Sequence, residues 1–207
     1  MIGNRILKIT AVQNTDALLD QAEELEHFPF GFLLWESSIA LATYLVGRPH
    51  LTYGRKVLEL GAGVGVTGIV AQSLGGAVRQ TDHQKGALVL AEQNAEQNGI
   101  QGIERFAADW RNWTCTDRFD LILGSDITYE RGMHFYLEEI FSANLTPDGV
   151  VLLSDPGRPQ TLEFASRLEL RGWHIEIDTL TVDLAGRGQS DGATDITILA
   201  LTKRSMT

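Results

Sequence analysis

Hydrophobic positions along this chain switch repeatedly between helical and strand spacing after residue 35. Residues 35–46 are apolar with helical spacing, and residues 57–60 form the first short apolar run typical of a core strand. From that point strand and helix patterns alternate, and two strands close the chain. The predicted strands are 57–60, 77–81, 103–107, 119–124, 150–154, 173–182 and 195–201, and the later predicted helices are 66–74, 85–98, 131–143 and 160–171.

This alternation predicts an α/β fold, a Rossmann-like doubly wound sheet that is mostly parallel with an antiparallel last strand. A chain of 207 residues suits one domain. We expect a core over residues 55–207 and an N-terminal helical extension over residues 1–50 that covers the ligand site. The extension contains a polar segment compatible with a helix (16–27) and an aromatic loop (28–32), and a glycine-rich loop (185–192) joins the last two strands.

A glycine-rich turn follows the first predicted strand, in the run ELGAGVGVTG that starts at Glu59. Glycine reaches positive φ and lets a ligand approach the bare backbone. The amides at the start of the next helix point outward and carry partial positive charge. Such a turn usually holds an adenosine-containing cofactor, and Gly61, Gly63 and Gly65 are its candidate contacts.

The glycines alone allow two cofactors. Gly63, Gly65 and Gly68 match the G-x-G-x-x-G pattern of dinucleotide sites, whereas Gly61, Gly63 and Gly65 match G-x-G-x-G preceded by an acid, Glu59. A carboxylate repels the pyrophosphate of NAD, but it suits the ammonium and sulfonium of S-adenosylmethionine. Glu59 therefore favours S-adenosylmethionine and is itself a candidate contact. A tight turn without a ligand is the remaining interpretation.

Acidic residues also end the next two strands, at the edge where ligands bind in such sheets. Asp82 is placed to accept hydrogen bonds from the ribose hydroxyls, or else to cap the next helix, and His83 neighbours this position. Asp109 and Trp110 could bind and cover the adenine ring, or form a turn and pack against the core. Both readings of Asp109 and Trp110 stay open.

Asp126 and Tyr129 follow the fourth strand, whose end lies near that of the first strand in a doubly wound sheet. A carboxylate there can bind a substrate ammonium, and a tyrosine offers a hydroxyl and a π face that attracts cations. Helix capping by Asp126 and packing by Tyr129 are the competing roles. Asp155 and Arg158, at the end of the fifth strand, could form a rim of the site, but a structural turn is the preferred interpretation.

Composition narrows the range of partners. The net charge of −10 argues against broad binding to nucleic-acid phosphates, and it suits a basic protein partner or serves solubility alone. The single cysteine, Cys115, allows no intrachain disulfide, and no histidine spacing predicts a metal site. Residues 1–10 do not resemble a signal peptide, and no apolar run reaches the length of a membrane span. We therefore expect a cytoplasmic protein without a membrane partner.

Several segments, taken together and in order, resemble the seven-β-strand protein-lysine methyltransferases. They are LWESSIALATYL from Leu34, the glycine run 57–71, Thr81-Asp82, Asp109-Trp110, and FDLILGSDITY from Phe119, which contains the D-x-x-Y signature. The resemblance covers about residues 30–155 and implies methyl transfer from S-adenosylmethionine to a protein lysine, with S-adenosylhomocysteine as product. It implies cofactor contacts at Trp35, Gly61, Ala62, Gly63, Asp82, Trp110 and Ser125, and amine contacts at Asp126 and Tyr129.

Three other functions remain open at this point. The same broad family includes enzymes that methylate small amines such as nicotinamide, so the acceptor could be a small molecule. An NAD-dependent oxidoreductase would use Gly63, Gly65 and Gly68, but Glu59 and the D-x-x-Y segment argue against it. A non-catalytic binding protein on the same fold is disfavoured by the intact glycines and Asp82.

Overall fold

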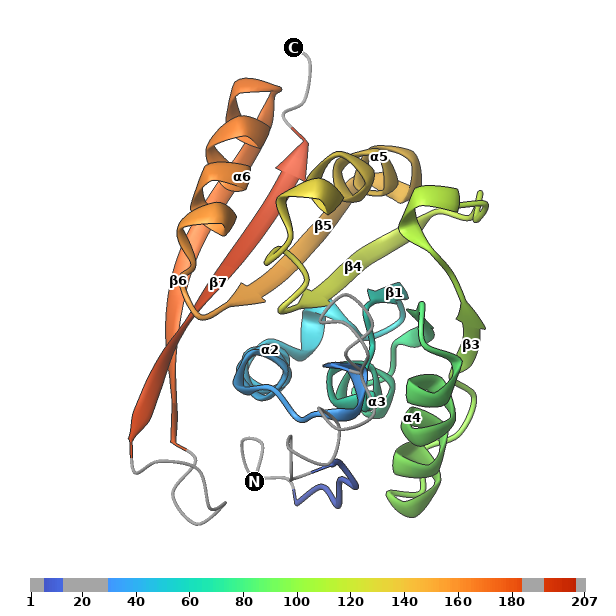
Figure 1. The fold of residues 1–207 in the computed structure, drawn as a ribbon. Helices are drawn as coiled ribbons and strands as arrows, with labels where there is room; N and C mark the ends of the chain where they lie inside the picture. Colours follow the sequence, from blue (N-terminus) through green and yellow to red (C-terminus); the bar gives the residue numbers. More distant parts are fainter. Residues whose placement is uncertain (1–5, 13–29, 184–191, 204–207) are drawn as a thin grey trace, which may run out of the picture.

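One sheet runs through the molecule, with the strand order β3-β2-β1-β4-β5-β7-β6 (Figure 1). This computed structural model describes residues 6–12, 30–183 and 192–203. The strands are β1 (Lys56–Leu60), β2 (Ala77–Asp82), β3 (Glu104–Ala107), β4 (Phe119–Ser125), β5 (Leu145–Asp155), β6 (Trp173–Asp183) and β7 (Ala193–Lys203). Strands β1 to β5 are parallel, and β7 pairs antiparallel with both β5 and β6. The predicted fold, including the antiparallel last strand, is confirmed.

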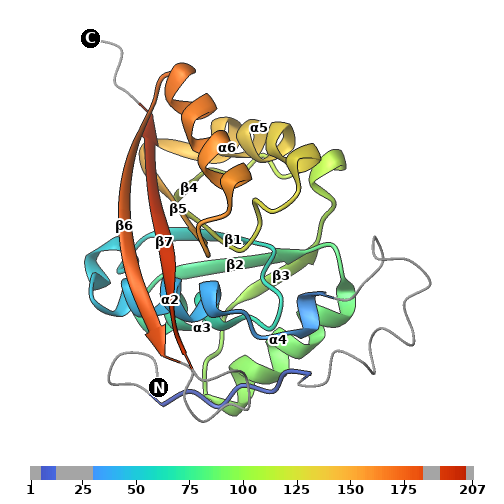
Figure 2. The same ribbon diagram turned by 60° about the vertical axis from the view of Figure 1, so that its left-hand side comes forward.

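Helices cover both faces of the sheet. Figures 1 and 2 show α2, α3 and α4 on one face and α5 and α6 on the other. The helices are α2 (Glu36–Val46), α3 (Val66–Ser73), α4 (Lys85–Gln97), α5 (His134–Asn144) and α6 (Pro159–Leu170), and short 3-10 turns cover Phe30–Phe32, Pro49–Leu51, Trp110–Asn112 and Arg131–Met133. Each of these five helices was predicted from the sequence, within a few residues of these bounds.

The two faces of the sheet build two hydrophobic clusters, because side chains alternate along a strand. Val57 and Leu121 are fully buried against the apolar stripes of α2 and α3. Leu58 and Ile122, one residue further on, are fully buried in the opposite cluster with α5 and α6. Buried on both faces, the central strands have the continuous apolar sequences expected of a parallel sheet. This packing holds the carboxyl ends of β1, β2 and β4 at one edge.

Strand β5 begins earlier than the sequence indicates. The prediction placed a turn at Pro147 to Gly149, but the strand starts at Leu145 and carries these residues within it. Its register against β4 shifts, with Phe119 opposite Leu145 and Leu121 opposite Val150. Proline cannot donate a ladder hydrogen bond, so the extra residues bulge out of the pairing. The turn signal therefore marks an irregularity of the strand and not its start.

Some predictions concern residues outside the described part of the chain. The polar segment 16–27 lies there, as do residues 28–29 of the aromatic loop and residues 185–191 of the glycine-rich loop. Residues 8 and 10 are described, and their backbones exchange hydrogen bonds with the side chains of Asn98, at the C-cap of α4, and Asn94, on α4. Among the described residues, no helix is both long enough and apolar enough to span a membrane.

Candidate functional site

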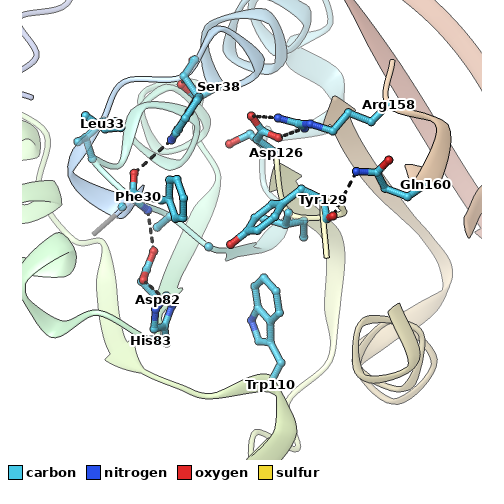
Figure 3. A pocket seen from close by; sticks show the side chains of 18 residues that line it. Phe30, Leu33, Ser38, Asp82, His83, Trp110, Asp126, Tyr129, Arg158 and Gln160 are labelled. Carbon is cyan, nitrogen blue, oxygen red and sulfur yellow. Dashed lines mark hydrogen bonds and ion pairs between the residues drawn. The ribbon is translucent and has the colours of Figure 1, made fainter. Parts of the chain in front are cut away.

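A cavity of about 390 Å³ opens at the carboxyl ends of β1, β2 and β4 (Figure 3). Its volume lies within the range of small-molecule sites. The lining residues come from the segment before α2, the first turn of α2, the glycine turn, and the ends of β2, β3, β4 and β5. They are Phe30, Gly31, Leu33, Trp35, Ser38, Gly61, Ala62, Gly63, Val64, Asp82, His83, Trp110, Ser125, Asp126, Ile127, Tyr129, Arg158 and Gln160. In the view of Figure 3, Asp82 and His83 lie on one side and Asp126 and Arg158 on another, with Tyr129 between them and Trp110 below it.

The glycine turn presents bare backbone to this cavity. Gly61 and Gly63 have φ of 63° and 51°, in the left-handed region that favours glycine. A Cβ on Gly61 would lie 2.8 Å from Cγ2 of Ile127, and one on Gly63 would lie 3.2 Å from the carbonyl oxygen of Gly31. Both positions therefore require glycine for conformation and for space. Gly61, Ala62 and Gly63 all line the cavity, as predicted.

Gly65 does not line the cavity, and the sequence prediction for it is corrected. Its φ is 87°, and a Cβ there would lie 2.7 Å from Cβ of Ala91 on α4. Gly65 thus allows α3 and α4 to pack closely at the start of α3. The positive φ of Gly65 was expected. Glycine at this position serves the packing of α3 against α4, and not a ligand.

Glu59 also lies outside the cavity lining, contrary to the prediction. Its side chain is buried, and Oε2 accepts hydrogen bonds from the backbone N–H of Gly68 (3.1 Å) and from Nε2 of Gln80 (2.7 Å). Glu59 has the same side-chain direction as Val57 because strand side chains alternate, and that face is covered by α3. Burial raises the pKa of Glu59 to about 7, against the lowering effect of its hydrogen bonds. The carboxyl group therefore connects the end of β1 to α3 and to β2, below the glycine turn.

Asp82 projects into the cavity from the end of β2, as predicted. Its Oδ2 accepts from the N–H of Gly63 at 3.0 Å, and its Oδ1 accepts from the N–H of Gln84 at 2.9 Å. The residue is 5% exposed. Asp82 therefore links the glycine turn to the start of α4, and its carboxylate faces the same space as the turn. His83 lines the cavity beside it, with an exposed side chain.

Trp110 and Asp109 have different positions, although they are neighbours in sequence. Trp110 lines the cavity, and its ring reaches within 3.5 Å of where a Cβ on Gly61 would stand. Asp109 is not among the lining residues. Its carboxylate accepts from the backbone N–H of Arg111 at 3.0 Å and forms an ion pair with that arginine's guanidinium, which lowers the pKa of Asp109. Trp110 lies in the predicted place, and Asp109 caps the turn, so its contact with an adenine stays a prediction.

An aromatic cluster of Phe30, Trp35 and Tyr129 borders the cavity. The ring centroid of Phe30 lies 6.2 Å from that of Trp35 and 6.2 Å from that of Tyr129. Nε1 of Trp35 donates to the carbonyl oxygen of Phe30 at 3.1 Å, which fixes this arrangement at the start of α2. Trp35 lines the cavity, as predicted, and Tyr129 is 46% exposed, so its ring is open to an approaching molecule.

Asp126 adopts an unusual backbone conformation at the end of β4. Among the described residues it is the non-glycine residue with positive φ, at 57°, and its N–H donates to the carbonyl oxygen of Ser154 at 2.8 Å. Such conformations cost energy and concentrate at functional sites. Both Asp126 and Ser125 line the cavity, as predicted. Burial raises the pKa of Asp126, and the Arg158 guanidinium opposes that effect.

Several lining residues were missed by the sequence reasoning. Arg158 had been interpreted as part of a structural turn, but it lines the cavity and forms an ion pair with Asp126. Gln160 also lines the cavity and donates to the carbonyl oxygen of Tyr129 at 3.2 Å. Both follow the end of β5, where ligands bind in such sheets, and that placement was the available signal. The other missed lining residues are Phe30, Gly31, Leu33, Ser38, Val64 and Ile127.

The cavity fits a molecule with an adenosine part and a cationic part. The buried carboxylate of Asp82 can accept from hydroxyl groups, and Trp110 provides an aromatic surface beside the glycine backbone. The Asp126 carboxylate and the Tyr129 ring lie where a cation would be favoured. Among the described residues, no cluster of histidine, cysteine, aspartate and glutamate could hold a metal ion.

Comparisons with known proteins agree with this geometry. The chain is 34% identical over 137 residues to the electron transfer flavoprotein beta subunit lysine methyltransferase of Danio rerio, covering 64% of this chain and 52% of that one. It is 36% identical over 138 residues to the protein N-lysine methyltransferase METTL21A of Danio rerio, covering 59% of each. The chain thus spans about half the length of the first of these relatives.

Solved structures share the fold. A putative RNA methyltransferase from Pyrococcus horikoshii, PH1948, superimposes with a TM-score of 0.65 at 17% identity, covering 95% of this chain and 94% of that chain. At that identity the likeness shows the architecture alone. A family model described as lysine methyltransferase matches residues 13–169, most of the chain. The chain belongs to this lysine methyltransferase family.

Proposed function

We propose that this protein transfers a methyl group from S-adenosylmethionine to the side-chain amine of lysine in a protein. The observation that carries the proposal is the shared cavity, which joins the glycine turn and Asp82 to Asp126 and Tyr129. The first group suits an adenosine-containing cofactor, and the second suits an amine. Family membership and the names of the relatives support the same reaction.

The cofactor would be held by the residues that line one half of the cavity. In this proposal the Asp82 carboxylate accepts from the ribose hydroxyls, the Trp110 ring covers the adenine, and Gly61 and Gly63 give the backbone close access. Trp35, Ala62, His83 and Ser125 complete the contacts. Bound S-adenosylmethionine supplies an electrophilic methyl group on a sulfonium. Because that centre already has a good leaving group, the protein mainly aligns the amine with it.

The amine must be neutral when it attacks. Lysine has an ordinary pKa of about 10.4, so the amine arrives as an ammonium and has to lose a proton. We infer that Asp126 binds and orients the amine while its proton passes to water. The Tyr129 ring closes the other side of the site and attracts the cationic form. As the nitrogen–carbon bond forms, the carbon–sulfur bond breaks and its electron pair stays on sulfur.

The test is transfer of a labelled methyl group from S-adenosylmethionine into a cell lysate that is then divided into protein and small-molecule fractions. We expect label in protein, on lysine residues located by mass spectrometry. Asp126→Asn should reduce the rate by at least about tenfold, since misplacement of a reacting group can cost about 100-fold. Asp148→Asn, at an exposed aspartate in the β5 bulge, is the matched control and should retain the rate.

Label in the small-molecule fraction alone would contradict the protein acceptor and favour the small-amine alternative. Full activity of Asp126→Asn would remove Asp126 from the mechanism. Tyr129→Phe, which keeps the ring and removes the hydroxyl, separates the two functions of that side chain. The cytoplasmic location and the exclusion of nucleic-acid and membrane partners stay predictions, supported by the net charge of −10 and the sequence patterns.

A further inference from the structure

Arg158 joins two carboxylates at the amine side of the cavity. Its Nη1 lies in contact with Oδ1 of Asp126 and 2.8 Å from Oδ2 of Asp155, and its Nη2 lies 3.3 Å from Oδ2 of Asp126 (Figure 3). The backbone N–H of Arg158 also donates to Oδ1 of Asp155, at 2.6 Å. One guanidinium therefore fixes the position of Asp126 relative to the end of β5.

Asp155 provides a rigid anchor for this arrangement. Its side chain has no exposed surface (0%), and that of Asp126 is 9% exposed. Thr128 and Thr161, both buried, share a hydrogen bond of 2.7 Å between their hydroxyls, and the Thr128 hydroxyl lies 3.4 Å from Oδ2 of Asp155. The anchor thus connects β5, the segment after β4, and the first turn of α6.

The charges of this cluster do not balance. Asp126 and Asp155 contribute two carboxylates, and Arg158 contributes one guanidinium. Glu36, at the start of α2, adds to the negative charge around Asp126, and Asp126 in turn raises the pKa of Tyr129. The cluster therefore holds more negative than positive charge, in a largely water-excluded place where unbalanced charge is costly. An entering ammonium would restore the balance.

We propose that Arg158 is a positioning residue for the methyl acceptor: it holds the Asp126 carboxylate in place and ionised, and leaves a negative charge that the acceptor's ammonium neutralises. This inference rests on the proposed function, since it assigns the amine to Asp126. Arg158 does not need to touch the amine. It acts through Asp126, as a bidentate guanidinium is well suited to do.

The electrostatics of Asp126 support this role. Burial raises the pKa of Asp126, and the Arg158 guanidinium is the main influence that lowers it. Without Arg158 the carboxyl would keep its desolvation and lose its cation, so its pKa would rise further. At a given pH a larger fraction of Asp126 would then be protonated, and a protonated carboxyl cannot pair with an ammonium.

A purely structural ion pair between the segment after β4 and the segment before α6 would predict something different. Its loss would lower stability and would also raise the pKa of Asp126, but it would leave the rate of methyl transfer unchanged. The measurement must therefore follow both the Asp126 carboxyl and the reaction. Side-chain carboxyl carbons of labelled aspartate give resonances that move with pH, and the one absent from Asp126→Asn belongs to Asp126.

We would compare wild type, Arg158→Gln and Arg158→Lys, with Arg131→Gln as the matched control. Arg131 pairs with Glu163 on the exposed surface of α6 and lies outside the cavity lining. In Arg158→Gln the titration of Asp126 should move up by about one pH unit or more, because an adjacent opposite charge shifts a pKa by roughly 1–3 units. Arg158→Lys keeps the charge and should titrate closer to wild type.

Labelled methyl transfer into the lysate protein fraction gives the second readout. We expect the rate to fall in the order wild type, Arg158→Lys, Arg158→Gln, because an ammonium cannot reproduce the planar contact that two guanidinium nitrogens make with Asp126. The affinity for S-adenosylhomocysteine should change by less than about threefold in both variants. If Arg158→Gln does not fold, the comparison of Arg158→Lys with wild type decides, and equal rates in the two would overturn the inference.

The two proposals fail in different ways. No methyl transfer by wild type at any pH would refute the proposed function. Transfer by wild type together with an unchanged Asp126 titration, or an unchanged rate, in Arg158→Gln would overturn only the role of Arg158. A shift of equal size in Arg131→Gln would overturn it as well, since it would reveal a general charge effect.

Discussion

The carboxylate of Asp82 accepts hydrogen bonds from the protein backbone itself, without any ligand. Its two oxygens accept from the N–H groups of Gly63 and Gln84, so its orientation relative to the glycine turn is fixed. A carboxylate held in this way loses little conformational freedom when it accepts from a ligand hydroxyl. At the residue scale, pre-orientation is the main contribution of the chain to cofactor binding.

Asp82→Ala should weaken the binding of S-adenosylhomocysteine by roughly 10- to 100-fold. A hydrogen bond to a charged group contributes about 1.5–3 kcal/mol, and each 1.4 kcal/mol is a factor of ten. Titration calorimetry measures the change. His83→Ala, which truncates an exposed side chain on the same wall, should change the affinity much less. Equal losses in the two variants would contradict a specific role for Asp82.

Glu59 makes the stability of the protein depend on pH. Its pKa is raised from 4.5 to about 7 by burial, so the folded state binds a proton more tightly than the unfolded state does. Between these values the unfolding free energy must fall as pH rises, and above about pH 7 this contribution stays constant. At 1.36 kcal/mol per pKa unit, the loss is on the order of 3 kcal/mol.

Glu59→Gln should remove most of that dependence. Urea unfolding at pH 5 and pH 8 would then show wild type losing stability relative to the variant at the higher pH. Glu96→Gln, at an exposed position on α4, is the control and should follow wild type at both values. A wild-type protein equally stable at both pH values, relative to Glu59→Gln, would contradict the raised pKa.

At the scale of elements, the connection between β1 and α3 depends on small residues for packing. Gly68 lies in α3, where a Cβ would come within 2.4 Å of Oε2 of Glu59 and 2.6 Å of Nε2 of Gln80. Gly65 makes similar room for Ala91 on α4. The glycine-rich run therefore serves two needs. Gly61 and Gly63 face the cavity, whereas Gly65 allows α3 and α4 to pack together and Gly68 allows α3 to approach the sheet.

Gly68→Ala should destabilise the fold by about 1–3 kcal/mol, the usual cost of overpacking a buried position. The measurement is the shift in the midpoint of urea unfolding. Gly132→Ala is the matched control, because its nearest neighbour would be 3.6 Å away, an ordinary contact. If both variants had wild-type stability, the buried contact between Gly68 and Glu59 would not be as tight as described.

At the scale of the whole molecule, one sheet with a hydrophobic cluster on each face supports a site at one edge. The cavity takes residues from the segment before α2 and from the ends of β1 to β5. A ligand there contacts segments that are far apart in the chain. Since it binds only when all of them are in place, the ligand should stabilise the global fold.

Saturation with S-adenosylhomocysteine should raise the midpoint of thermal unfolding. At 100 times the dissociation constant the stabilisation is about 2.7 kcal/mol, which corresponds to roughly 5–10 °C for a domain of this size. NADH at the same concentration should leave the midpoint unchanged. A shift with NADH and none with S-adenosylhomocysteine would favour the dinucleotide alternative over the methyl donor.

Most elements could be predicted because their signals are local. The apolar periodicity of α2 and the buried runs of β1 and β4 depend on neighbours a few positions apart. Strand alternation also predicts the direction of the Glu59 side chain, because it places Glu59 on the same face as Val57. The motif match pointed instead to a cofactor contact. Arg158 could not be identified in this way, because its ion pair with Asp126 joins residues 32 positions apart.

The sequence by itself determined the alternating fold, the glycine turn, and the acids at the strand ends, since all of these follow from short-range patterns and from the geometry of parallel sheets. Only the tertiary structure decided which of those groups share a cavity. Glu59 lies beneath α3 and Gly65 lies between α3 and α4, so neither lines the cavity. Asp109 pairs with Arg111 and does not line it either. Arg158 lines it because the segment after β5 lies next to Asp126. The physical reason is that contacts between distant segments are set by how the helices pack on the sheet, and no local pattern records that.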